Sequence, residues 1–262
     1  MNDQRPPGLD VGASGGADGA ECESIYRELV AWYPLLDPVA EHEEEAECFA
    51  AALRGVLGPG NGSLLEIGAG AGNNAVFLKR HFACTLSDIA EPMLSLSRAQ
   101  NPECEHVAGD MRKLRLDRTF DAVLIHDAIT YMTSEADLRL AIDSAWRHTR
   151  PGGAALLAPD LYREGFEASS GLISGCDGEL GLEAVEWTWD PDPSDTVYRV
   201  DFAFLLRRGV DVRAVHETHL EGLFPRRTWV EVAAGVGFET DWIERPIGGG
   251  ETDHVLLCRR PR

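Results

Sequence analysis

Three glycines stand at every second position in the stretch LEIGAGAGNNAVFLKR, residues 65–80. They follow a short apolar run and precede a run with helical spacing, so a strand is predicted to end where a helix begins. Glycine lets a ligand approach the backbone closely, and the start of a helix presents free N–H groups. Gly68, Gly70 and Gly72 give the spacing G-x-G-x-G, whereas the dinucleotide fingerprint is G-x-G-x-x-G. The stretch predicts a cofactor-binding loop, with a plain tight turn as the alternative.

Acidic residues near this loop indicate what kind of cofactor it would hold. Asp88 ends the next predicted strand, where a carboxylate can accept hydrogen bonds from both hydroxyls of a ribose. That placement suits a dinucleotide and other nucleoside cofactors equally well. Glu66 precedes the glycines, and a carboxylate there favours a cationic ligand over a pyrophosphate. Asp110, within GDM at 109–111, would end a third strand and could accept an adenine amino group.

Apolar runs and helical runs alternate through the middle of the chain. We predict strands at 63–68, 83–88, 105–110, 120–126 and 152–160, and helices at 73–81, 91–99 and 134–149. Strands that lack polar alternation and are followed by helices indicate a parallel sheet covered on both faces. Right-handed crossovers then make this α/β sheet doubly wound.

The rest of the chain shows other patterns. The first twenty residues are rich in Gly, Pro and Asp, and prolines interrupt the helical runs that follow them. After the α/β region, about three runs alternate with period two, which predicts an antiparallel sheet. We therefore predict five segments: a disordered tail at 1–20, a helical segment at 21–58, an α/β core at 59–160, an antiparallel β insert at 161–224, and a helix with two last strands at 225–262.

Charge and cysteine content limit the classes of partner and compartment. The chain has 44 acidic and 24 basic residues, and a net charge of −20 repels nucleic acid and anionic membranes. The six cysteines show no C-x-x-C spacing, so we expect reduced thiols rather than disulfides or a zinc site. We find no 18-residue apolar segment and no signal peptide. We therefore expect a cytoplasmic protein with a small-molecule partner and no bound metal.

The motifs of residues 60–160, taken in order, resemble those of the class I S-adenosylmethionine-dependent methyltransferases. The resemblance lies in the glycine loop, in GDM, in FDAVLIHDAITYM at 120–132 and in RHTRPGGAALLAPD at 147–160. It implies a doubly wound, mostly parallel seven-stranded sheet of the Rossmann-like methyltransferase type. It also implies S-adenosylmethionine as cofactor and S-adenosylhomocysteine as product. A sulfonium is a cation, so acidic surroundings would stabilise it without a metal.

The same resemblance implies a role for each matched residue. The methionine part of the cofactor would lie along the glycine loop and the ribose beside the acid that ends the second strand. The adenine would lie among residues after the second and third strands, and the acceptor would meet the cofactor after the fourth. The implied cofactor-binding residues are Glu66, Gly68, Ala69, Gly70, Gly72, Asp88, Ile89, Met93, Asp110, Met111 and His126.

Two further segments resemble a subgroup of small-molecule methyltransferases, which includes the N,N-dimethyltransferases of nucleotide-linked amino sugars. They are IYRELVAWYPLL at 25–36 and VHETHLEGLFPRRTWVEVAAGVGF at 215–238. The likeness implies that the N-terminal segment closes over the cofactor as a lid and that the inserted sheet roofs the substrate. The inserted sheet is also a candidate for a homodimer contact. The implied substrate-binding residues are Tyr26, Tyr33, Tyr131, His219 and Arg226.

Methyl transfer is an in-line displacement, so positioning supplies most of what a protein contributes. An amine acceptor has only to lose a proton, whereas a hydroxyl needs a general base, for which histidine is the usual residue. The candidate catalytic residues are His126, His219 and Tyr33. His216 is a further histidine of the same strand as His219, but period two places the two side chains on opposite faces.

Other functions stay open from the sequence. A basic peptide would suit the acidic surface as a macromolecular acceptor, whereas the sequence offers no basic-aromatic patch for RNA. A non-catalytic protein that binds S-adenosylmethionine could keep the same fold. A nicotinamide dehydrogenase would use a similar sheet, and Glu66 with the glycine spacing argues against it. The sequence leaves the acceptor open, and with it the choice among nitrogen, oxygen and carbon.

Overall fold

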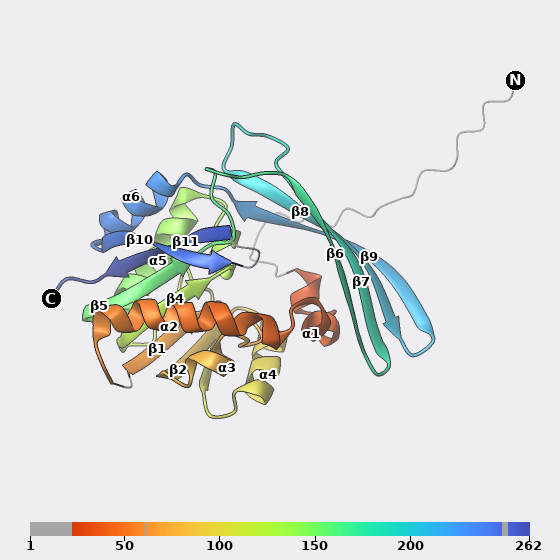
Figure 1. Ribbon diagram of the computed structural model, residues 1–262, viewed down its shortest axis with the longest axis horizontal. Helices are drawn as coiled ribbons and strands as arrows, with labels where there is room; N and C mark the ends of the chain where they lie inside the picture. The colour runs from red at the N-terminus through yellow and green to blue at the C-terminus, as the bar shows by residue number, and fades with distance from the viewer. Residues whose placement is uncertain (1–22, 61, 248–250) are drawn as a thin grey trace, which may run out of the picture.

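The computed structural model describes residues 23–60, 62–247 and 251–262, so the predicted tail at 1–20 lies outside it. Within these residues, the strands form a seven-stranded sheet and a separate four-stranded sheet (Figure 1). The strands of the larger sheet are β1 Gly62–Ile67, β2 Phe82–Asp88, β3 Glu105–Ala108, β4 Phe120–His126, β5 Thr149–Ala158, β10 Glu239–Ile247 and β11 Glu251–Arg259.

The larger sheet has the order β10-β11-β5-β4-β1-β2-β3. Strands β1 to β5 run parallel, whereas β11 is antiparallel to both of its neighbours. The strand order reverses between β1 and β4, so the carboxyl ends of these strands open a crevice, the usual ligand position in open α/β sheets. The predicted fold class, a doubly wound and mostly parallel seven-stranded sheet, is confirmed.

Helices cover both faces of this sheet. Helices α2 and α3 pack on one face, over Leu64 and Leu124, and α5 and α6 pack on the other, over Leu65 and Val123. Neighbouring residues of one strand thus enter opposite cores, which explains why these strands lack polar alternation. No helix of the described residues is long and apolar enough to cross a membrane. The helices that follow the N-terminal segment are α2 Glu43–Leu57, α3 Ala75–Leu78, α4 Glu91–Gln100, α5 Glu135–His148 and α6 Arg226–Val236.

Helix α3 is shorter than the helix predicted at 73–81. Asn73 and Asn74, which precede it, direct their side-chain amides to Asp37 and His126, at 2.9 and 3.0 Å. Neither amide caps the helix, because both serve contacts with distant parts of the chain.

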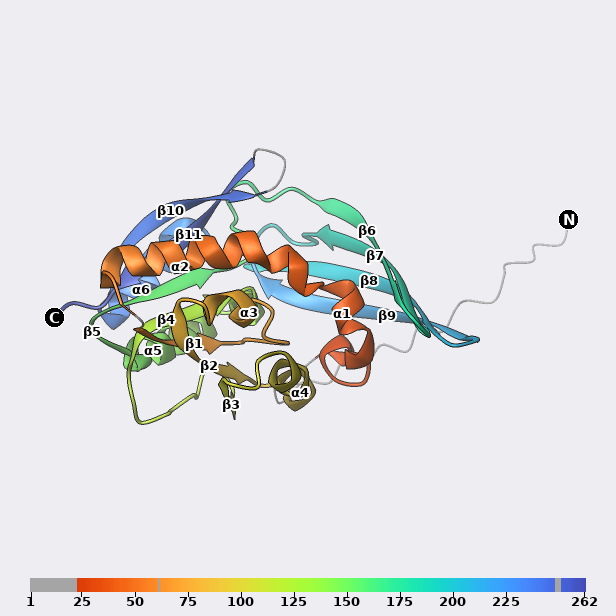
Figure 2. The same ribbon diagram turned by 60° about the horizontal axis from the view of Figure 1, so that its bottom comes forward.

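The N-terminal segment is also less regular than predicted. It consists of the short turns η1 Ser24–Tyr26, η2 Val30–Trp32, α1 Tyr33–Leu36 and η3 Val39–His42 before α2 begins. Ile25, Leu29 and Trp32 from this segment are buried against the four-stranded sheet. We call residues 23–42 the lid, since they lie between the two sheets (Figure 2).

The second sheet is antiparallel and contains β6 Ser169–Asp177, β7 Leu180–Trp189, β8 Val197–Arg208 and β9 Asp211–Gly222, in that order. The sequence predicted about three strands here, and β6 is the one it missed. The β6 sequence SSGLISGCD is largely exposed and lacks apolar alternation, so only its pairing with β7 along the whole strand defines it. We call the face of this sheet that packs against the lid the roof.

Candidate functional site

A cavity of about 750 Å³ lies between the glycine loop, the lid and the roof. It also reaches the turn η4 Ala128–Tyr131, which follows β4. The structure brings together most of the predicted site residues in its wall, from segments far apart in the chain. Gly72 and Arg226 are the exceptions. The predicted residues that line the cavity are Tyr26, Tyr33, Glu66, Gly68, Ala69, Gly70, Asp88, Ile89, Met93, Asp110, Met111, His126, Tyr131 and His219.

The glycine loop connects β1 to α3, and its glycines serve two purposes. Gly70 has a φ of +53°, and a Cβ there would lie 3.5 Å from Cε of Met93 and 4.0 Å from the Tyr33 hydroxyl. A larger side chain at Gly70 would therefore enter the space between loop and lid. Gly72 is not among the residues that line the cavity, so its contact with the cofactor stays a prediction. A Cβ at Gly72 would lie 2.3 Å from Oγ of Ser97, so this glycine lets the loop pack on α4.

Asp88 ends β2 beside this loop, and its carboxylate holds the loop in place. Oδ2 accepts a hydrogen bond from the amide of Gly70 at 2.8 Å, and Oδ1 accepts one from the amide of Ala90 at 2.8 Å. Burial raises the pKa of Asp88, and the amide hydrogen bonds offset part of that rise. A carboxylate has about four lone-pair positions, so acceptor capacity remains for two ribose hydroxyls.

Glu66 is a buried carboxyl group at the end of the cavity next to β1. It is 3% exposed, and its Oε2 has no hydrogen-bond partner. Burial raises the pKa of Glu66 to about 8, although His126 lowers it in part. A cationic ligand would stabilise the ionised form and supply the missing partner. The site therefore fits S-adenosylmethionine, which carries a sulfonium and an ammonium group.

Asp110 and Met111 line the same end of the cavity from the loop after β3. Nη2 of Arg112 lies 2.8 Å from Oδ2 of Asp110, and Nη1 of Arg112 lies 3.3 Å from Oδ1 of Asp137. Burial would raise the pKa of Asp110, but the hydrogen bonds from Arg112 outweigh it and lower the pKa. An ionised Asp110 only accepts hydrogen bonds, which suits the amino group of an adenine.

Tyr26, Tyr131 and His219 meet over the cavity from the lid, from η4 and from β9. The hydroxyls of Tyr26 and Tyr131 are 2.9 Å apart, and the Tyr131 hydroxyl lies 2.8 Å from Nδ1 of His219. Nε2 of His219 lies 3.2 Å from Oε1 of Glu217, which also accepts a hydrogen bond from the amide of Ile25. These contacts tie the lid to the roof.

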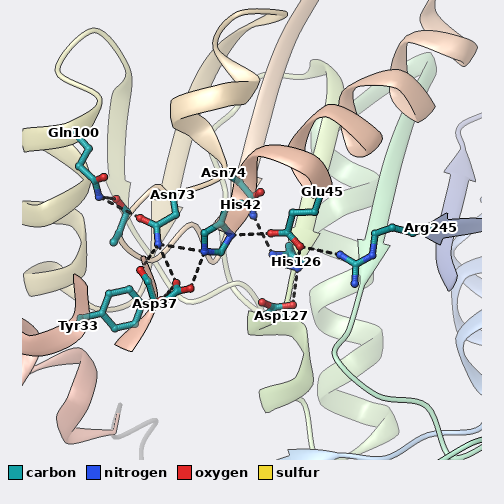
Figure 3. A network of polar contacts seen from close by, with 11 residues as sticks. Tyr33, Asp37, His42, Glu45, Asn73, Asn74, Gln100, His126, Asp127 and Arg245 are labelled. Carbon is teal, nitrogen blue, oxygen red and sulfur yellow. Dashed lines mark hydrogen bonds and ion pairs between the residues drawn. The ribbon is translucent and has the colours of Figure 1, made fainter. Parts of the chain in front are cut away.

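A chain of charged residues runs from the lid toward β4 (Figure 3). The Tyr33 hydroxyl donates to Oδ2 of Asp37 at 2.7 Å. His42 lies between two carboxylates, with Nε2 2.7 Å from Oδ1 of Asp37 and Nδ1 2.7 Å from Oε1 of Glu45. Burial would lower the pKa of His42, but the hydrogen bonds to Asp37 and Glu45 outweigh it and raise the pKa to about 10. His42 is therefore a cation at neutral pH that joins the lid to α2.

His126 continues this chain at the end of β4 (Figure 3). Its Nε2 lies 2.7 Å from Oδ1 of Asp127 and 3.3 Å from Oε2 of Glu45. Nη1 of Arg245, from β10, lies 2.9 Å from the same Glu45 oxygen. Burial would lower the pKa of His126, but Asp127 and Glu45 outweigh it and raise the pKa well above the ordinary value. The two carboxylates therefore favour the protonated form of the imidazole.

Several acids on the cavity wall were not among the predicted site residues, and Asp160 and Glu221 are two of them. Asp160 follows β5 and lines the cavity with Asp127; the enclosing wall and the Asp127 charge raise the pKa of Asp160 well above the ordinary value, although its side chain is exposed to the cavity. Glu221 lies on β9, where it accepts a hydrogen bond from Tyr198, and burial raises its pKa. Period two puts Glu221 on the same face as His219, and Asp160 ends a predicted parallel strand. Both signals were present in the sequence.

Arg226 is not among the residues that line the cavity, so its contact with substrate stays a prediction. The guanidinium lies over the rings of Tyr162 and Trp242, at 5.3 and 5.6 Å from their centres. Its Nη2 is 3.1 Å from Nδ1 of His254. A cation at the start of α6 is unfavourable for the helix, and here the aromatic rings compensate it.

Comparison with known proteins finds similarity to methyltransferases. Residues 64–153 match the model of a methyltransferase domain. The dTDP-3-amino-3,4,6-trideoxy-alpha-D-glucopyranose N,N-dimethyltransferase of Streptomyces venezuelae is 26% identical over 196 residues, which cover 73% of this chain and 82% of that one. The dTDP-3-amino-3,6-dideoxy-alpha-D-glucopyranose N,N-dimethyltransferase of Streptomyces fradiae is 25% identical over 224 residues, which cover 84% of each chain.

A solved structure shows the same fold. CalS10, an amino pentose methyltransferase from Micromonospora echinaspora solved with bound S-adenosylmethionine, superposes with a TM-score of 0.74 at 24% identity. The match covers 89% of this chain and 97% of CalS10. The fold, the cofactor loop and these relatives identify the chain as an S-adenosylmethionine-dependent methyltransferase that resembles small-molecule methyltransferases.

Proposed function

We propose that this methyltransferase acts on the amine nitrogen of a small molecule, with an amino sugar as the acceptor class. The observation that carries the proposal is the group of carboxyls formed by Asp127, Asp160 and Glu221 in the cavity wall. An amine is a cation at neutral pH, and carboxylates bind and orient cations through charge-assisted hydrogen bonds. The names of the two Streptomyces relatives, which give amino sugars as substrates, support the same class.

In this proposal, the strand order places the cofactor and the acceptor on opposite sides of the crevice. Glu66 and Asp88 lie on β1 and β2, whereas Asp127 and Asp160 follow β4 and β5 on the other side of the crevice. When bound, S-adenosylmethionine supplies a methyl group that its sulfonium makes electrophilic. The acceptor would then lie under the roof, with its nitrogen directed toward the glycine loop.

The carboxyls of this group take up the proton that the amine must lose before its nitrogen can attack. The enclosing cavity wall and the charge of the neighbouring Asp127 raise the pKa of Asp160, whose side chain is exposed to the cavity, so its ionised carboxylate is a stronger base than an ordinary aspartate. The neighbouring carboxylates favour a protonated His126, so we assign it the role of holding Asp127 in position and balancing its charge. This assignment revises the role of general base that the sequence suggested for His126.

The aromatic groups of the lid and roof complete the proposed site. Tyr33, Tyr131 and His219 line the cavity, and each has a fixed polar partner. We propose that these three side chains contact the bound ligands and exclude water from the reacting atoms. Their hydrogen bonds to other groups preorganise them, which lowers the cost of ordering them on binding.

Matched acceptors test the choice of nitrogen. The enzyme is incubated with methyl-labelled S-adenosylmethionine and a panel of amino glycosides, each beside its parent with a hydroxyl at the same carbon. We expect label on the amines alone, and none with Gly70→Val, which fills the cofactor site. Label on oxygen would contradict the proposal. In a second incubation with a cell lysate, label in proteins instead of small metabolites would also contradict it.

We also propose that the outer face of the four-stranded sheet forms a homodimer. Leu172, Val185, Trp187 and Leu205 share that face and are 84%, 45%, 54% and 49% exposed. Two copies related by a twofold axis would cover this apolar surface. Sedimentation equilibrium should give a dimer for the natural chain and a monomer for Trp187→Glu, and a monomeric natural chain would refute the proposal.

A further inference from the structure

The cavity holds many acidic side chains and very few cations. Of the described residues that line it, ten are Asp or Glu, one is Arg and none is Lys. Several of the acids belong to the lid, to the ends of β4 and β5, and to the roof, where the acceptor would lie. They are Glu23, Asp127, Asp160, Glu167, Glu186 and Glu221.

The cations of this wall already have partners. Arg112 is bound by Asp110 and Asp137, on the side of the cavity where we expect the adenine. The two histidines with raised pKa values, His42 and His126, each lie between two carboxylates. The described part of the wall therefore offers no unpaired arginine or lysine to an anionic substrate.

The acids on the acceptor side disfavour further negative charge. Each of these carboxyls that is ionised repels a bound anion, and the neighbouring cation of His126 is already paired with carboxylates. A diphosphate would add negative charges without the bidentate arginine contacts that usually bind phosphate. An ammonium group would instead relieve the repulsion.

We propose that the acceptor reaches this enzyme without a nucleoside diphosphate or any other phosphate group. The inference rests on the proposed N-methylation, and it separates this chain from the relatives whose names specify dTDP-linked substrates. For an amino sugar, a glycosyl transfer that releases the nucleotide would come before methylation. The substrate class is then a free amine or an amino glycoside.

Binding of nucleotides tests this inference without knowledge of the acceptor. dTDP, UDP and pyrophosphate are titrated by calorimetry into the enzyme loaded with S-adenosylhomocysteine. We expect no saturable heat up to about 1 mM of each. Saturable binding of a nucleoside diphosphate at micromolar concentration would overturn the inference.

Two charge-reversal variants test whether the acidic charge of the cavity is what excludes a diphosphate. Glu186 faces the cavity from β7, whereas Glu183 lies on the opposite face of the same strand and contacts Ser174. Glu186→Lys should strengthen dTDP binding at least about tenfold over the natural enzyme, and the matched control Glu183→Lys should not. Equal effects of the two substitutions would show that cavity charge does not exclude the diphosphate.

Turnover separates this inference from the proposed function. Initial rates are compared for an amino glycoside and for the same amino sugar linked to dTDP. We expect the glycoside to react at least about tenfold faster. N-methylation of the dTDP-linked sugar with the higher rate would refute this inference and leave N-methylation intact. If neither is methylated and nucleotides do not bind, the exclusion of phosphate holds while the proposed acceptor class fails.

Discussion

The carboxylate of Asp88 accepts a 2.8 Å hydrogen bond from the amide of Gly70, which joins the end of β2 to the loop after β1. One side chain thus fixes the shape of the glycine loop and faces the cavity beside it. The loop and the proposed ribose contact therefore depend on the same carboxylate.

Substitution of Asp88 should weaken cofactor binding. Asp88→Ala removes the ribose acceptor and releases the loop, so we expect a loss of about 2–3 kcal/mol, or roughly 30- to 150-fold in Kd. Isothermal titration with S-adenosylmethionine measures the change. Asp192→Ala is the matched control, because Asp192 also accepts a hydrogen bond from a backbone amide, that of Ser194, far from the cavity. Unchanged affinity in Asp88→Ala would refute the placement of the ribose.

Glu66 should make cofactor binding depend on pH. With a pKa of about 8, most Glu66 carboxyls carry a proton at pH 7, and a cationic cofactor favours the ionised form. Binding should therefore release close to one proton at pH 7, and Kd should fall as the pH rises toward 8 and then level off. Calorimetry in buffers of different ionisation enthalpy counts the proton. Glu66→Gln should release none, and an absence of proton release in the natural enzyme would contradict this account.

The carboxyl group of Glu66 also affects the folding stability of the protein without cofactor. Its pKa is raised from 4.5 in the unfolded chain to about 8, so the native state holds this proton longer. The contribution of Glu66 to stability therefore decreases as the pH rises from 4.5 to 8, and Glu66→Gln removes that decrease. The free energy of unfolding in urea is measured for both proteins at pH 5 and pH 8. If the natural enzyme became more stable relative to Glu66→Gln as the pH rises, the result would contradict this prediction.

Gly70 and Gly72 should respond differently to alanine. Gly72→Ala would clash with Ser97, so we expect a large loss of stability, on the order of 3 kcal/mol. Gly70→Ala meets only ordinary contacts but strains a backbone with φ of +53°, at a cost of about 1 kcal/mol. Gly70→Ala should raise the cofactor Kd more than it lowers Tm. Thermal melts and titrations of both variants test this. A Gly72→Ala variant that is stable but binds no cofactor would contradict this account and support the predicted contact of Gly72 with the cofactor.

His42 should make lid docking sensitive to alkaline pH. Its pKa is raised from 6.5 to about 10, so its stabilising effect is complete below pH 6.5 and decreases as the pH rises toward 10. The slope is at most about 1.4 kcal/mol per pH unit. Urea unfolding at pH 6 and pH 9 should show a smaller pH dependence for His42→Gln than for the natural enzyme.

The control for His42 is His81→Gln. His81 pairs with Glu47 of α2 at 2.8 Å but does not line the cavity. This variant should keep the pH dependence of the natural enzyme. A His42→Gln variant with the same pH dependence as the natural enzyme would show that the ion pairs of His42 do not stabilise the fold.

The sequence predicted the features that local patterns encode. Apolar strands followed by helices predicted the sheet, and glycine spacing with Glu66 and Asp88 pointed to residues that line one cavity in the structure. These residues are close in sequence to the elements that position them, so spacing alone places them.

Features that depend on distant pairing were harder to predict. Strand β6 has almost no apolar pattern of its own and is defined by β7. Asp160 and Glu221 acquire their importance by meeting Asp127 in three dimensions. The contacts of Arg226 with the rings of Tyr162 and Trp242 also depend on distant parts of the chain, so its position outside the cavity wall could not be read from the sequence.

A crystal structure with S-adenosylhomocysteine tests the central claim most directly, since the account places the cofactor and the acceptor in one cavity. We predict both ribose hydroxyls within about 3 Å of the Asp88 carboxylate and the sulfur directed toward Asp127 and Asp160. Density for the ligand elsewhere, or a sulfur directed away from these carboxyls, would contradict the account.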